Sequence, residues 1–160
     1  MEQLDEPAGA ELLRHLLGLF DRPAEPGAIA KLRQKPAIPG LTQRLQNLDN
    51  PGWNKALSHL RKSALLTTGR YGFLDCHALV REYFGERFRS INPRAWRAAH
   101  LHLYKYFCDV PKKVPDTLAE MEPLFQAIIH GCNAGLHQKA LRDVYWQRIQ
   151  RSEEALRRTN

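Results

Sequence analysis

Apolar residues recur at intervals of three and four through most of the chain, a spacing typical of amphipathic helices. The leucine-rich stretch "ELLRHLLGLF" is the clearest case, and Asp21 to Pro23 end it. Capping residues mark two further starts: Asp49 or Asn50 before Pro51, and Asn92 before Pro93. The pattern predicts helices over residues 7–20, 26–34, 41–48, 51–64, 78–89, 92–107, 117–134 and 137–151.

The period changes between residues 65 and 76. Two short apolar runs flank "TGRYG", and Gly69 and Gly72 permit a tight reversal, so a β-hairpin is predicted there. Short helices followed by a hairpin are typical of a winged helix. We therefore expect a mainly α-helical fold: a winged-helix domain with one small β-hairpin over residues 1–90, then a helical extension over 91–160.

Composition narrows the class of protein. The chain has 160 residues, of which 43% are hydrophobic and 26% charged, as in soluble globular proteins. No apolar run approaches the ~20 residues of a membrane span. The first residues are acidic, unlike a signal peptide, and the cysteines at 76, 108 and 132 are odd in number and widely spaced. A cytoplasmic protein with reduced thiols and no membrane association is expected.

The formal net charge of +7 favours an anionic partner. Residues 1–25 are acidic, so the positive charge lies downstream, and we expect it to be spread over several helices. One hypothesis is a winged-helix DNA-binding protein, a transcription regulator. It would use helix 51–64 and the wing. The residues available for DNA contact are Asn54, Lys55, His59, Arg61 and Lys62, with Arg70 on the wing.

Signatures of catalysis are missing from the sequence. No glycine is followed by lysine, so the chain has no phosphate-binding loop of the G-x-x-x-x-G-K type. Cys76 and His77 are adjacent on a predicted strand and would point to opposite faces. His100 and His102 lie two apart on a helix, and the order of His130, Cys132 and His137 matches no zinc pattern. We expect no enzyme activity, no metal and no cofactor in this chain.

The stretch "FLDCHALVREYF", residues 73–84, resembles the end of the winged-helix domain of STAND-type signalling NTPases, the NB-ARC and NACHT relatives. There a strand ends in a Met-His-Asp-like triplet, here Cys76, His77 and Ala78, followed by "LVRE". Bacterial members also resemble this chain at "LLGLFDRPA", "PAIPGLTQRL" and "AWRAAHLHLYKYF". The usual aspartate of the triplet is Ala78 here.

This resemblance implies a regulatory, non-catalytic module. It would couple a nucleotide-binding domain, supplied in cis or in trans, to a helical sensor arm that binds protein partners. His77 would contact a phosphate of ADP held by that domain, so ADP or ATP belongs to a full-length parent. Only residues 73–84 match a specific sequence motif of the family.

The segment "PLFQAIIHGCNAGLHQKALRDVYWQRI" resembles the helical arm of the same family and, weakly, a tetratricopeptide-type (TPR-like) repeat. Gly135 would form the turn and Ala140 the close-packed position. Two alternatives follow. The helices fold back on residues 92–107, or further repeats normally cover Val144, Tyr145 and Ile149, and this face then supports a homodimer.

Overall fold

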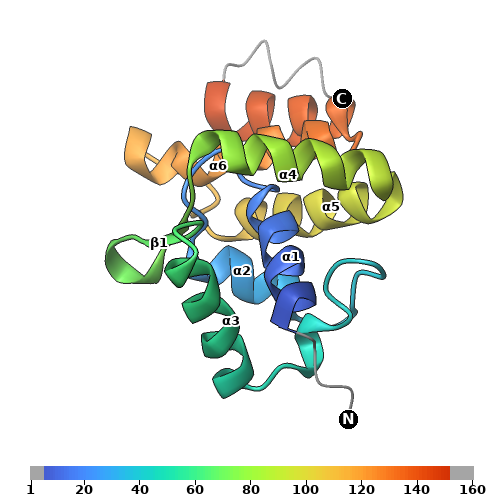
Figure 1. Cartoon of the computed structure of the whole chain (residues 1–160). Helices are drawn as coiled ribbons and strands as arrows, with labels where there is room; N and C mark the ends of the chain where they lie inside the picture. Colours follow the sequence, from blue (N-terminus) through green and yellow to red (C-terminus); the bar gives the residue numbers. More distant parts are fainter. Residues whose placement is uncertain (1–5, 152–160) are drawn as a thin grey trace. The chain divides into compact units, whose positions relative to one another are not determined.

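The computed structural model describes residues 6–151 and is mainly α-helical (Figure 1). The α-helices in this range are α1 (Glu6–Leu17), α2 (Pro26–Arg33), α3 (Asn50–Lys62), α4 (Ala78–Ile91), α5 (Pro93–Asp109), α6 (Leu118–Asn133) and the short α7 (His137–Lys139). A π-helix, Ala140–Gln150, follows α7 directly. Among the described residues, no helix is long and apolar enough to cross a membrane.

Two predicted helix starts are confirmed by their capping hydrogen bonds. The Asp49 carboxylate accepts from the Gly52 N–H at 2.8 Å, and Pro51 lies in the first turn of α3. The Asn92 side chain accepts from the Ala95 N–H at 3.1 Å before α5. The predicted break at Gly135 is also confirmed, because this residue has a φ of 82° between α6 and α7.

Three segments differ from the predicted helices. Residues 41–48 form turns and only a 3₁₀ turn, Leu45–Asn47, because the Thr42 hydroxyl accepts from the Ile38 N–H at 2.8 Å and holds a local turn. The first helix ends at Leu17 instead of residue 20. The last predicted α-helix is mostly π-helical, with the Arg151 N–H reaching back five residues to the Trp146 carbonyl.

Strand structure in the described part of the chain is minimal. Strands β1 (Thr67–Thr68) and β2 (Leu74–Asp75) pair antiparallel over two residues each. Ala24, between α1 and α2, exchanges two backbone hydrogen bonds with Leu74, of 2.8 and 2.9 Å. The predicted small β-hairpin is therefore reduced to two residue pairs, and helices account for nearly all regular structure among the described residues.

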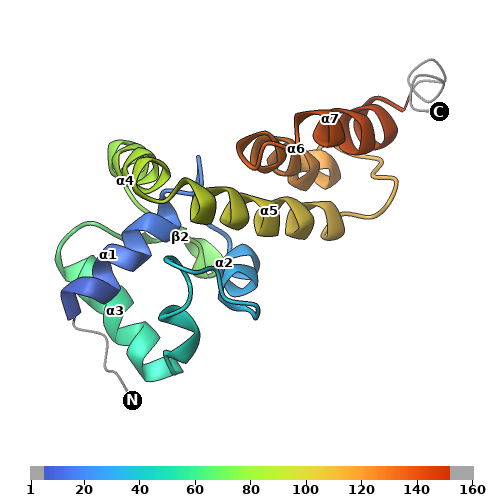
Figure 2. The ribbon, with the colours of Figure 1, turned by 90° about the vertical axis from the view of Figure 1, so that its right-hand side faces the viewer.

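The chain divides into two compact units, residues 1–96 and 97–160. In unit 1, α1 lies between α3 and α4 and packs on both (Figure 2). Gly18 and Gly85 bring the backbones of α1's C-terminal turn and α4 together: a Cβ built on Gly85 would lie 2.6 Å from the Gly18 carbonyl oxygen. Only glycine at both positions allows this approach.

Unit 2 contains the part of α5 after Trp96, together with α6, α7 and the π-helix. Gly131 of α6 lies at the centre of this packing, because a Cβ there would come within 2.9 Å of both Ala140 and Tyr104. The expectation that the C-terminal helices fold back on the preceding helix is confirmed for the part of α5 after residue 96. Val144 is 1% exposed, so it does not lie on an open face as the second alternative required, whereas Tyr145 remains exposed.

Candidate functional site

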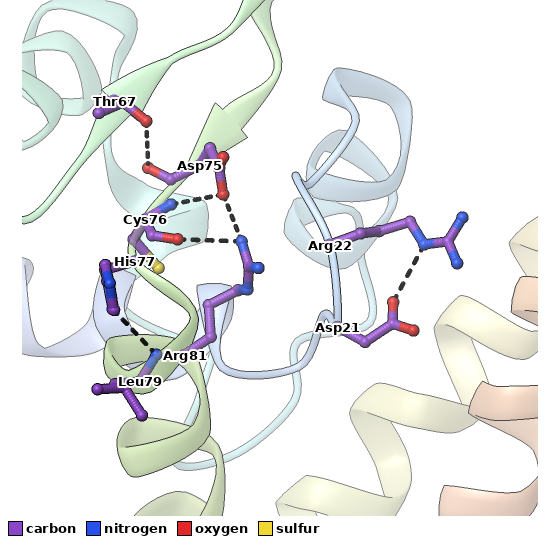
Figure 3. A network of polar contacts seen from close by, with 8 residues as sticks. All are labelled: Asp21, Arg22, Thr67, Asp75, Cys76, His77, Leu79 and Arg81. Carbon is purple, nitrogen blue, oxygen red and sulfur yellow. Dashed lines mark hydrogen bonds and ion pairs between the residues drawn. The ribbon is translucent and has the colours of Figure 1, made fainter.

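The junction between β2 and α4 is held by an ion pair. The Asp75 carboxylate pairs with the Arg81 guanidinium and also accepts from the Cys76 N–H at 2.8 Å (Figure 3). Arg81 donates a second bond to the Cys76 carbonyl at 3.0 Å, and the Thr67 hydroxyl donates to the Asp75 carbonyl at 3.3 Å. These bonds fix the backbone that presents the next residue, His77.

His77 is the N-cap of α4, and its imidazole is exposed. The Leu79 N–H donates to His77 Nδ1 at 3.3 Å (Figure 3). A ring nitrogen that accepts a hydrogen bond carries no proton, so the proton of the neutral imidazole lies on Nε2. Nε2–H is therefore a hydrogen-bond donor whose ring is oriented by the helix start. His77, the residue for which the family resemblance implies a phosphate contact, therefore has an oriented, solvent-facing ring.

Cys76 has a different environment from its neighbour. It is 6% exposed, and burial raises the pKa of its thiol; Arg81 opposes this rise and Asp75 adds to it. The thiol is therefore protonated at neutral pH, a poor nucleophile. The prediction that both residues lie on a strand is wrong, because β2 ends at Asp75 and His77 is the N-cap of α4; the thiol is nevertheless buried and the imidazole exposed.

The candidate DNA-contacting residues lie on α3 and at the turn after β1. Leu57 and Leu60 are the buried positions of α3, while Trp53 and Ala56 are half-buried. The Arg33 guanidinium lies over the Trp53 ring at 4.2 Å. The predicted contact residues Asn54, Lys55, Arg61, Lys62 and Arg70 are exposed, and His59 is half-buried.

The structure also joins two histidines that sequence reasoning did not pair. His100 Nδ1 of α5 lies 2.8 Å from His130 Nδ1 of α6; both side chains are 1% exposed, and the His130 ring stacks on Phe107 at 5.3 Å. His100 follows Trp96, another buried residue, by four positions, so helical spacing could have indicated its burial, although it was not predicted. Its partner lies thirty residues away and left no local signal.

The other histidine and cysteine positions considered for metal binding do not join this pair. Cys132 and His137 are exposed, unlike His130. Within residues 6–151, no group of three or more histidine, cysteine or acidic side chains is arranged to hold a metal ion.

No family model, curated protein or solved structure matches the chain. Two arrangements in unit 1 bear on function: the oriented imidazole of His77 and the exposed polar face of α3.

Proposed function

We propose that this chain is a non-catalytic regulatory module of a STAND-type signalling NTPase, in which unit 1 is a winged helix. The order of elements supports this: α1, the Ala24 bridge, α2, α3, β1 and β2. In a winged helix a first strand follows the first helix and pairs with the last strand, and Ala24 pairs with Leu74 of β2 in that way. The strands are short versions of that sheet.

The observation that carries the proposal is the geometry of His77. Its Nδ1 is occupied by the N-cap bond, so Nε2–H remains to donate to a phosphate oxygen of ADP. A hydrogen bond to a charged group contributes about 1.5–3 kcal/mol. Arg81 is committed to Asp75 and to the Cys76 carbonyl, so its role is to hold the junction and not to bind the nucleotide.

Unit 2 is proposed as the first, TPR-like element of the sensor arm, the part that binds protein partners. The antiparallel packing of α6 against α7 and the π-helix supports this, with Gly131 and Ala140 in close contact. Exposed Leu141 and Tyr145 on the π-helix are the apolar positions on which a following repeat or a second copy would pack.

The test uses this module joined to its nucleotide-binding domain, in one chain or mixed in trans, and loaded with fluorescent ADP. His77→Ala should release ADP about ten- to a hundredfold faster, the factor that corresponds to one lost charge-assisted hydrogen bond. His137→Ala, which removes an exposed histidine of unit 2, is the control and should leave the rate unchanged. Equal rates for both variants and the wild type would reject the proposed phosphate contact.

A further inference from the structure

The net positive charge of the chain is densest in one segment. Residues 26–74, from the start of α2 to β2, contain eight lysines and arginines and a single acid, a formal net charge of +7. The remaining 111 residues contain sixteen basic and sixteen acidic residues and sum to zero. This segment includes α2, α3 and the turn after β1, so the excess of positive charge extends over more than one helix. Six cations of the segment are exposed: Lys35, Arg44, Lys55, Arg61, Lys62 and Arg70.

The outer face of α3 is basic and mostly polar. Asn54, Lys55, Ser58, Arg61 and Lys62 are exposed and follow one side of the helix at intervals of one, three and four residues. The helix contains no acidic residue, and the one acid of the segment, Asp49, is engaged as the N-cap. Apart from Pro51 in the first turn, no apolar or aromatic residue of α3 is exposed, which disfavours both membrane insertion and the stacking of single-stranded bases.

The turn between β1 and β2 exposes an aromatic ring to solvent and holds the backbone of that residue in a strained conformation. Tyr71 is 92% exposed and has a φ of 58°, in the left-handed region that non-glycine residues rarely adopt. Because the Tyr71 ring is exposed, it adds little buried surface to the fold, and burial does not offset the strain. Strained residues of this kind concentrate at ligand-binding positions. Arg70, the adjacent cation, is exposed on the same turn.

We propose that unit 1 binds duplex DNA, with α3 in the major groove and the Arg70–Tyr71 turn on the flanking backbone. A helix of ~10–12 Å diameter fits the ~12 Å wide major groove of B-DNA, whereas the deep, narrow groove of duplex RNA excludes it. Lys55, Arg61 and Lys62 contact phosphates, and Asn54 reaches a base edge. This function goes beyond nucleotide sensing and uses neither His77 nor ADP.

The test is fluorescence anisotropy of the full chain with a labelled DNA duplex of mixed sequence, titrated at several salt concentrations. Four phosphate contacts (Lys55, Arg61, Lys62, Arg70) predict a slope of about −3.6 in log K against log salt, which is a loss of about 150-fold between 50 and 200 mM salt. The triple variant K55Q/R61Q/K62Q should flatten the slope to about −0.9, with a matching loss of affinity. Tyr71→Ala should weaken binding without changing the slope.

The matched control is R89Q/R94Q/R97Q, which removes three exposed cations outside the segment and lowers the net charge equally. It should keep the wild-type slope. Equal losses in the two triple variants would show attraction by net charge only and overturn the proposal. Absence of binding at 50 mM salt, or tighter binding of single-stranded DNA or duplex RNA than of the duplex DNA, would also overturn it. Far-UV circular dichroism of each variant checks the fold, and R70Q tests the turn independently of α3.

Discussion

Replacing Gly85 with alanine tests the backbone contact on which unit 1 is built. In an isolated helix this change is favourable by about 1 kcal/mol, since alanine has the higher helix propensity. In α4 the added methyl group would lie 2.6 Å from the Gly18 carbonyl oxygen, a backbone atom that no rotamer change can move. The two helices must separate, and overpacking of this kind costs about 1–3 kcal/mol on average and more against a rigid neighbour. We expect a net destabilisation of about 1–2 kcal/mol.

The assay is equilibrium urea unfolding followed by far-UV circular dichroism, with Ser90→Ala as the control. Ser90 is exposed on the same helix, so alanine there changes helix propensity alone and should stabilise by a few tenths of a kcal/mol, about 0.5 at most. If Gly85→Ala is as stable as Ser90→Ala, the backbones of α1 and α4 do not meet at these glycines. The packing described for unit 1 would then be refuted.

Three further outcomes are expected. Arg148→Ala should destabilise unit 2 by about 1.5–3 kcal/mol in urea unfolding, because its guanidinium donates to four backbone carbonyls between residues 108 and 113; Arg148→Lys should recover only part of this. The pKa of Glu120 is lowered, first by its hydrogen bond to Lys112. The contribution of this carboxylate to stability is therefore complete above the ordinary carboxyl pKa and is lost as the pH falls through the lowered pKa. In acid titrations monitored by circular dichroism, Glu120→Gln and high salt should both weaken this pH dependence of stability. Burial and the raised pKa of Cys76 should make it alkylate far more slowly than exposed Cys132 in the folded protein, a difference that mass spectrometry should find abolished in denaturant.

Local chemistry was predictable from the sequence, and long-range contacts were not. The caps Asp49 and Asn92 were identified because a capping residue acts within three positions of itself. The contact between Gly18 and Gly85 and the pairing of His100 with His130 join distant segments, and neither leaves a periodic trace in the chain. The missing helix at residues 41–48 has a local cause that its apolar spacing concealed, the Thr42 hydroxyl bond.

The two proposed activities of unit 1 depend on different properties and are therefore separable. The phosphate contact needs one imidazole whose orientation is set by the N-cap bond, and a single substitution at His77 should remove it without changing the charge of the segment 26–74. DNA binding depends on the lysines and arginines of that segment. Loss of a single imidazole should therefore leave it unchanged. If His77→Ala changes ADP release but not the salt slope, and K55Q/R61Q/K62Q does the reverse, the module carries two independent sites. If His77→Ala also changes the slope of this chain alone, with no ADP present, the imidazole and α3 are energetically coupled within unit 1 and the two sites are not independent.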